Sequence, residues 1–344
     1  MPLVKRPTIH DLAAASGVSV ATVDRVLNRR LPVRDDTARR VVAAAEAIGF
    51  HATGLLRQRL NETPKRTFTF LLQKKEHEFY RNFAAELTAA VKQATSIQGR
   101  AIVEFIDQIV PSVIATRIRE AGQRSDGLAV VAVDHPLVSE AIAEVSRAGK
   151  HVVTLLSDVT APERVAYLAV DSRRAGRTAA WAISRLAKSS GKIGILLGSH
   201  RYLSQEMAEI SFRSYMREHA PEFQLLEPLV NLDDPRIAYE AIVDMIASNP
   251  DLAGIYVAGG GAEGLIKALR DENAGCRIVA VCNELTSDTR AALIDGTLDM
   301  ALETPITELS RLAVAILSRA CAGENIETGQ SKLLPARVVI SESL

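Results

Sequence analysis

The sequence contains few residues of the types that build disulfide scaffolds or metal centres. Its three cysteines are too few and too scattered for a disulfide framework or a CxxC metal site, so we expect reduced and mostly buried thiols at Cys276, Cys282 and Cys321. The seven histidines have no metal-ligand spacing, and no GxSxG or HExxH motif occurs. These absences indicate a protein that is not an enzyme and holds neither a metal nor a cofactor.

Long apolar runs are also missing. The N-terminal stretch MPLVKRPTIHDL has no uninterrupted apolar core of the kind that a signal peptide requires, and no later run is long enough to cross a bilayer. We therefore expect a cytoplasmic protein without a membrane partner.

The composition is that of a globular protein with an uneven distribution of charge. The 344 residues are 47% apolar and 24% charged, and they suggest two or three domains. Residues 1–66 carry 12 Lys and Arg against 6 Asp and Glu, whereas the remainder carries 29 against 35, although the whole chain is neutral. A small basic head on a mildly acidic body is typical of a separate module that binds a polyanion.

The first sixty residues predict three short helices and no strand. Thr8 is placed to cap a helix that runs through Ser16, Gly17 breaks that helix, and Ser19 is placed to cap the next one. The segment DTARRVVAAAEAIGF, residues 36–50, predicts the third helix. Two helices joined by a short turn that contains glycine are typical of a helix-turn-helix.

Beyond residues 61–66 the sequence alternates between apolar strands and amphipathic helices. This alternation predicts parallel sheets covered by helices on both faces, and its length of about 280 residues predicts two lobes with a cleft between them. The fold class is therefore an all-α helix-turn-helix head plus an α/β two-lobed body with parallel sheets. The predicted strands are 67–73, 101–106, 127–133, 151–156, 165–170, 192–198, 223–230, 254–259, 277–282 and 336–341.

The second helix of the head carries side chains suited to reading DNA. A helix in the major groove presents its first turn to the bases, which places Val20, Ala21 and Arg25 there. Arg25 can pair with both acceptors of guanine, whereas the two small residues read only shape and thymine methyl groups. Ser19, Thr22 and Asn28 are suited to phosphate oxygens.

The segment TIHDLAAASGVSVATVDRVLN, residues 8–28, resembles the head of the lactose-repressor (LacI/GalR) family of transcription factors. The resemblance implies a homodimeric regulator, most often a repressor, that binds a double-stranded DNA operator and responds to a small-molecule effector. It divides the chain into a head at 1–49, a hinge and linker at 50–66, and an effector-binding and dimerisation domain at 67–344. The DNA-binding residues expected together are Thr8, Ser19, Val20, Ala21, Thr22, Asp24, Arg25, Asn28, Arg57 and Leu60.

Three positions depart from this family's pattern in the DNA-binding region. Asp24 replaces the usual serine, and it can accept from a cytosine amino group, hold Arg25, or join the surface cluster of Arg29 and Arg30. The hinge GFHATGLLRQRL has Ala52 in place of the usual proline and its last leucine, Leu60, one position late. Either Leu60 or Leu56 is then the minor-groove wedge, or the segment is a plain linker.

The body resembles the same family's effector domain, which is similar to periplasmic sugar-binding proteins, and LAVDSRRAGRTAAWAI at 168–183 resembles the entry to its second lobe. Polar residues that follow strands are the expected effector ligands, because α/β sheets bind ligands at the carboxyl ends of their strands. Acids and amides there suit a polyhydroxylated ligand, which is a sugar, a polyol or a sugar acid. The candidates are Lys75, Glu76, Asp134, Ser157, Ser204, Asn283 and Glu303, with Asp158 and Glu284 beside them.

Some features of the body leave other interpretations open. Ala208 stands where sugar-binding relatives usually have arginine, and AGGGAEG at 258–264 stands where they tend to have an Asn-Asp pair. Gly259, Gly261 and Gly264 also satisfy GxGxxG after a strand, with Glu284 about twenty residues on, so a dinucleotide-binding oxidoreductase is an alternative. A pure sugar-binding protein is a further alternative on the body alone.

Overall fold

The computed structural model describes residues 7–28, 33–54, 56, 63–275, 277–324, 326 and 329–344. The head and the body are described separately below. None of the helices in these ranges is both long and apolar enough to cross a membrane.

The described part of the head contains the three helices that the sequence predicts. A capping box begins the first helix, because the Thr8 hydroxyl accepts from the Asp11 amide at 3.3 Å while the Asp11 carboxylate accepts from the Thr8 amide at 2.7 Å. Gly17 ends it in the left-handed region, with a φ of +65° that favours glycine. The three helices are α1 (Ile9–Ser16), α2 (Val20–Asn28) and α3 (Asp35–Ala47).

One side of each of these helices packs into a single small core. The buried members are Leu12, Ala13, Val23, Val26, Ala38, Val41, Val42, Ala45, Phe50 and Leu56. Their spacing of three and four residues along each helix is what lets three short helices close a common apolar interior.

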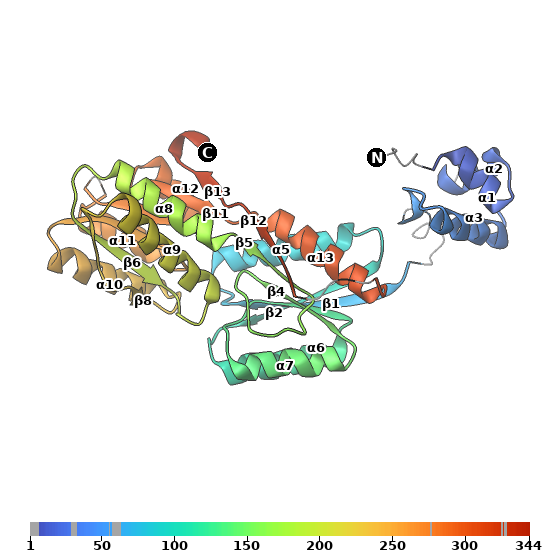
Figure 1. Cartoon of the computed structure of the whole chain (residues 1–344), viewed down its shortest axis with the longest axis horizontal. Helices are drawn as coiled ribbons and strands as arrows, with labels where there is room; N and C mark the ends of the chain where they lie inside the picture. The colour runs from blue at the N-terminus through green and yellow to red at the C-terminus, as the bar shows by residue number, and fades with distance from the viewer. Residues whose placement is uncertain are drawn as a thin grey trace. The chain divides into compact units, whose positions relative to one another are not determined.

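The first lobe of the body is a six-stranded sheet in the order β12-β5-β4-β3-β1-β2 (Figure 1). The pairs β1 with β3, β3 with β4, β4 with β5 and β5 with β12 are all parallel. Figure 1 shows α6 and α7 on one side of this sheet and α5 and α13 on the other. The elements are β1 (Lys65–Gln73), α5 (Glu78–Gln93), β2 (Gln98–Ile106), α6 (Pro111–Arg124), β3 (Gly127–Val130), α7 (Pro136–Arg147), β4 (His151–Leu155), β5 (Ala166–Val170), α13 (Ile306–Cys321) and β12 (Gln330–Leu334).

The second lobe has a sheet in the order β13-β11-β10-β9-β6-β7, with β8 also paired to β6. Its pairs are parallel except at the edge, where β13 runs antiparallel to β11. The elements are α8 (Ser172–Leu186), β6 (Lys192–Leu197), α9 (Leu203–His219), β7 (Gln224–Leu225), β8 (Leu229–Val230), α10 (Pro235–Ser248), β9 (Leu252–Val257), α11 (Ala262–Asp271), β10 (Val279–Cys282), α12 (Ser287–Ile294), β11 (Met300–Glu303), β13 (Arg337–Val339) and the short 3₁₀ turn η1 (Ser341–Ser343).

The chain crosses between the two lobes three times. The crossings follow β5, β11 and β12, because α8 packs on the second sheet, α13 packs on the first, and β13 joins the second sheet again. Each crossing leaves a strand at its carboxyl end, so all three lie at the sheet edges where α/β proteins bind ligands.

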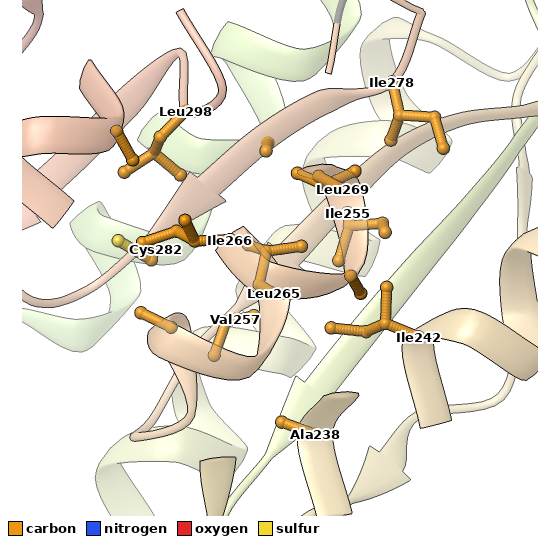
Figure 2. Close-up of a cluster of buried hydrophobic side chains, with 14 of the residues drawn as sticks. Ala238, Ile242, Ile255, Val257, Leu265, Ile266, Leu269, Ile278, Cys282 and Leu298 are labelled. Atoms are coloured by element: carbon orange, nitrogen blue, oxygen red, sulfur yellow. The ribbon is translucent and has the colours of Figure 1, made fainter. Parts of the chain in front are cut away.

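Buried aliphatic side chains fill both faces of the second sheet. Figure 2 shows the cluster on one face, where Ile242 of α10, Leu265 of α11 and Ile255 of β9 come together. Cys282 belongs to this cluster and is fully buried, and burial raises the pKa of its thiol to about 12. On the other face Gly176 lets α8 approach the backbone of α9, since a Cβ there would overlap the Ala208 carbonyl oxygen.

The predicted alternation of strands and helices is confirmed, but the strand list needs correction. Two strands were not predicted: β11, which is four residues long, and β12, whose polar sequence QSKLL hides the pattern. The segment predicted at 223–230 forms two short strands, β7 and β8, separated by Glu227 and Pro228. Proline lacks the N–H that a continuous ladder requires, which accounts for the break.

Candidate DNA-binding surface and effector cavity

Helix α2 presents one apolar and one polar side. Val23 and Val26 are buried in the head core, whereas Ala21, Arg25 and Asn28 are exposed at intervals of four and three residues. Ala21, Arg25 and Asn28 therefore form a stripe along the helix that is free to meet a partner. Val20, at the start of the helix, is half-buried.

The turn before α2 is held by hydroxyl groups. The Ser19 hydroxyl accepts from the Thr22 amide at 3.2 Å and lies 2.9 Å from the Thr22 hydroxyl. At the start of α1, the Thr8 hydroxyl donates to the Asp11 carboxylate at 2.7 Å. These side chains fix the two helix starts, where unpaired backbone N–H groups also favour a phosphate.

The Asp24 carboxylate forms a hydrogen bond with Asn28, which was not among its predicted partners. Its Oδ1 accepts from Nδ2 of Asn28 at 2.6 Å, one turn further along α2. The spacing of four residues is the signal that would have revealed this pair. The bond directs the Asn28 amide and places an acid next to the exposed stripe.

Of the three hinge residues that were candidates for DNA contact, only Leu56 is among the described residues. Arg57 and Leu60 lie outside the described residues. Leu56 is fully buried and packs in the head core together with Phe50. In this structure Leu56 is a core residue of the head.

A cavity lies at the carboxyl ends of the strands, between the two lobes of the body. We call it the inner cavity; the space free of protein atoms in it, including the solvent at its mouth, is about 750 Å³. It is lined by His77, Phe79, Tyr80, Leu156, Val170, Ser172, Ala175, Ser204, Gln205, Asp233, Ala258, Gly259, Gly260, Asn283, Glu284, Leu302, Thr304 and Ala336. Apolar walls with several polar groups are typical of a site for a hydroxylated organic molecule.

Asp233 is the most deeply embedded acid of the inner cavity. Its side chain is 6% exposed, and its Oδ1 accepts from the Gly260 amide at 2.8 Å. The backbone is left-handed at both Leu232 and Asp233, and the Asn231 amide oxygen holds this turn by accepting from the Asp233 amide at 2.9 Å. Burial raises the pKa of Asp233, against the opposing effects of the Gly260 N–H, Lys74 and His77.

The glycine run 259–261 is explained by its contact with this turn. A Cβ on Gly259 would overlap Gln205, and a Cβ on Gly261 would overlap the Asn231 amide. Gly261 also has a φ of +108°, which other residues rarely adopt. Gly264 lies against the backbone at Pro235, where α11 packs on α10. Each glycine of the GxGxxG match therefore has a role in packing the chain against itself.

Asn283 and Glu284 follow β10 and face the inner cavity together. The Asn283 amide oxygen accepts from the Tyr256 hydroxyl at 2.9 Å, and its Nδ2 donates to the Ala258 carbonyl at 2.9 Å. These bonds fix the amide so that its remaining N–H is available to a ligand. Burial, together with the carboxyls of Glu263 and Asp233, holds the pKa of Glu284 well above its usual range.

Of the seven effector candidates, the structure brings Ser204 and Asn283 into the inner cavity. Ser157 lies next to it, with its hydroxyl accepting from the Ser204 amide at 3.4 Å. The remaining four lie outside its lining. Asp134 accepts from the Thr160 amide at 2.7 Å, Glu303 pairs with Arg337 at 2.9 Å, and the Lys75 amide lies 3.4 Å from an Asp107 oxygen.

Glu76 lines a second cavity, which we call the outer cavity and which adjoins the inner one at His77 and Asp233. The outer cavity is lined by Lys74, Glu76, His77, Glu78, Arg81, Asp107, Asp233, Asp234, Pro235, Arg236, Glu263 and Asp288. Among the described residues no group of acids, histidines or cysteines has the arrangement needed to hold a metal ion.

Direct bonds join the two lobes around these cavities. The Glu78 carboxylate of α5 accepts from both the amide, at 3.0 Å, and the hydroxyl of Ser287 at the start of α12. The Lys74 ammonium donates to the carbonyl oxygens of Leu232 and Asp233. The structure is therefore a closed arrangement of the two lobes.

The loop before α9 makes a further junction between the lobes. The Asp134 amide of the first lobe donates to the Arg201 carbonyl of the second at 2.8 Å. Tyr202 is 3% exposed and packs in the first lobe's core, where its hydroxyl has no hydrogen-bond partner among the described residues. Opening the lobes must withdraw this ring from the core.

Two family models match this chain. A model described as the periplasmic binding protein domain matches residues 68–325, and a model described as bacterial regulatory proteins, lacI family, matches residues 8–52. The maltose regulon regulatory protein MalI of Escherichia coli (strain K12) is 35% identical over 102 residues, which span 30% of this chain and 28% of that protein.

Solved structures share the fold of the body. One is an ABC transporter solute-binding protein from Agrobacterium vitis bound with α-D-tagatopyranose, with 19% identity, 81% of this chain and 95% of that chain covered, and a TM-score of 0.73. Another, from Actinobacillus succinogenes 130z with bound D-allose, has 14% identity, 81% and 99% covered, and a TM-score of 0.73. Over residues 68–325 the chain belongs to the periplasmic binding protein domain family, and a DNA-binding head of the lacI family of bacterial regulatory proteins precedes that domain at residues 8–52, which is the composition of a lacI-type transcription regulator rather than of an enzyme.

Proposed function

We propose that this protein is a cytoplasmic repressor that binds a near-palindromic operator as a homodimer and is controlled by a polyhydroxylated metabolite in the inner cavity. The observation that carries the proposal is the combination of an exposed polar stripe on α2 with a polar cavity enclosed by two bonded lobes. We propose three parts of the chain: a head at 1–49, a hinge and linker at 50–66, and an effector-binding and dimerisation domain at 67–344.

In the DNA complex, α2 lies in the major groove. Arg25 pairs with a guanine, while Val20 and Ala21 contact base edges by shape. Thr8, Ser19, Thr22 and Asn28 contact phosphates, and Asp24 directs the Asn28 amide through their 2.6 Å bond. Arg57 and Leu60 of the hinge contact the minor groove when the operator is bound.

A dimer is required because one head covers too little DNA for tight specific binding, whereas two heads read two half-sites. The effector changes operator affinity only if it binds the closed and open lobes with different affinity. The bonds at Glu78, Lys74 and Arg201 join the two lobes, so a ligand that also contacts both lobes favours closure.

The chemistry of the inner cavity supports a hydroxylated ligand. Asp233, Asn283, Gln205 and Ser204 offer acceptors and donors for several hydroxyl groups, and Phe79 and Leu302 offer apolar surface for the carbon skeleton. The two carboxyls disfavour an anion, which argues against a sugar acid. The sugars bound by solute-binding proteins of the same fold, and the name of the MalI protein, agree with a sugar or polyol.

Selection of genomic fragments with the purified full chain tests this function, with Arg25→Ala as the matched control. We expect wild-type protein to enrich a near-palindrome upstream of a transport or catabolic operon, and the variant to lose preference at one base pair of each half-site. Enrichment only after cell extract is added would identify a corepressor. No enrichment in either condition would contradict the proposed DNA-binding function.

A further inference from the structure

We propose that the effector carries a protonated amine that pairs with Glu284, in addition to the hydroxyl groups that the other side chains bind. The ligand class is then an amino sugar or an amino polyol. This inference rests on the proposed role of the inner cavity as the effector site, and it concerns the charge of the ligand rather than the existence of the site.

The charges that line the inner cavity motivate this choice. Asp233 and Glu284 are acids, and neither Lys nor Arg is among the described residues that line it; His77 is the single titratable base there. A carboxylate removed from water requires a cation or several hydrogen-bond donors. Asp233 has such partners, because its Oδ1 accepts from the Gly260 amide at 2.8 Å and from Nε2 of Gln205 at 3.5 Å, and the charge of Lys74 acts on it.

Glu284, which is half-buried in the wall of the cavity, lacks this compensation. No side-chain hydrogen bond or ion pair of its carboxyl is present among the described residues, and the ionisable groups that act on it, Glu263 and Asp233, are both acids. Glu263 adds to the negative potential, since its Oε2 is buried without a partner. Among the described residues no hydrogen bond reaches the Oδ2 of Asp233, although this side chain is more than nine-tenths buried and lines the cavity.

A metal ion does not fit this arrangement, because the acids of the described residues do not converge as a metal-binding group. An ammonium group suits it better, since one N–H can bond to Glu284 while the others bond to neighbouring acceptors such as the Oδ2 of Asp233. The ring or chain that carries the amine then lies between the apolar walls of the cavity.

The side chains that line the adjoining outer cavity are also mostly acidic. The outer cavity is lined by seven acids against three cations and His77. Two of these cations, Lys74 and Arg81, are directed at backbone carbonyl oxygens rather than at carboxylates. The resulting negative potential attracts a cationic ligand and repels an anion.

Calorimetric titration of the full chain with matched sugar pairs tests the proposal. The probes are D-glucosamine, D-galactosamine and D-mannosamine, the amino polyol 1-amino-1-deoxy-D-glucitol, the corresponding neutral hydroxyl compounds, and the N-acetylated amino sugars. We expect at least one amine to bind ten or more times more tightly than both its neutral and its acetylated counterparts. In Glu284→Gln this preference falls to within about twofold, whereas Glu240→Gln, an exposed residue of α10, retains it.

Three results would overturn the proposal. They are a neutral compound that binds as tightly as its amine, an amine preference that survives in Glu284→Gln, and a complete set of amines that does not bind. A neutral binder would leave the proposed function intact, because a hydroxylated effector would still occupy the cavity. The DNA selection described above is independent of these titrations, so a failure of the repressor function is recognised separately.

Discussion

The bond between Glu78 and Ser287 makes a quantitative prediction about lobe opening. Glu78 accepts two hydrogen bonds from Ser287 across the lobes, and these bonds hold the pKa of its carboxyl below the usual range. A hydrogen bond to a charged group contributes about 1.5–3 kcal/mol when it is well buried. Because Glu78 is half-buried, water replaces much of that contribution, and we expect about 1 kcal/mol for the pair. Glu78→Gln should therefore raise the open-to-closed ratio about fivefold.

Amide hydrogen exchange can measure this ratio even when the open state is rare. The reporter is the Asp134 amide, which donates to the Arg201 carbonyl across the lobes. It is distant in the sequence from the substituted residue. We expect its exchange to accelerate about fivefold in Glu78→Gln and to stay unchanged in Glu86→Gln, a control on the same helix. The Asn231 amide, which donates to Leu197 within one lobe, should not respond. Equal exchange rates of the Asp134 amide in wild type and Glu78→Gln would refute the prediction that the Glu78–Ser287 bonds hold the lobes closed.

Further predictions concern the head, the glycine turn and the cavity acids. Arg25→Ala should cost about 1–3 kcal/mol of operator binding and relax preference at one base pair, and an equal loss on random DNA in a fluorescence titration would show a phosphate contact only. Asp24→Ser frees the Asn28 amide and should change operator preference in a selection experiment; tighter binding with unchanged preference would reduce Asp24 to a simple charge effect. Gly261→Ala should lower the free energy of unfolding by more than 1 kcal/mol, because φ is +108° and Asn231 occupies the space, and denaturant titration checks this. Burial in the folded protein raises the pKa of Glu284, so the wild-type free energy of unfolding should decline as pH rises above about 4.3, the pKa of a glutamate in the unfolded chain. Glu284→Gln should remove part of that decline. Parallel pH profiles of the two proteins would contradict this prediction.

The head could be predicted almost completely because its signals are local. Thr8, Gly17 and Ser19 act within one turn of their own position, so a capping hydroxyl or a left-handed glycine can be recognised from the sequence alone. The pair of Asp24 and Asn28 is equally local, and its spacing of four residues is visible in the sequence.

The cavity could be predicted only in part because it depends on tertiary packing. The rule that ligands bind after strands led to Ser204 and Asn283, which line it, but also to Asp134 and Glu303, which form bonds elsewhere. Strand ends specify an edge of the sheet and not the direction of a side chain. Asp233 was missed because it follows a two-residue strand and depends on a left-handed turn that Asn231 stabilises. No periodic pattern marks such a turn.

The central claim is that the cavity and the head are coupled, and linkage measures it most directly. Once an operator and a cavity ligand are identified, the operator Kd is measured with the cavity empty and with the cavity saturated. The ligand Kd is measured with and without operator. If the two sites are coupled, both dissociation constants change by the same factor, of about 5 to 150, and Asn283→Ala, which removes a cavity amide, abolishes the response while leaving operator binding intact. An operator Kd that is unchanged when the cavity is saturated would contradict it.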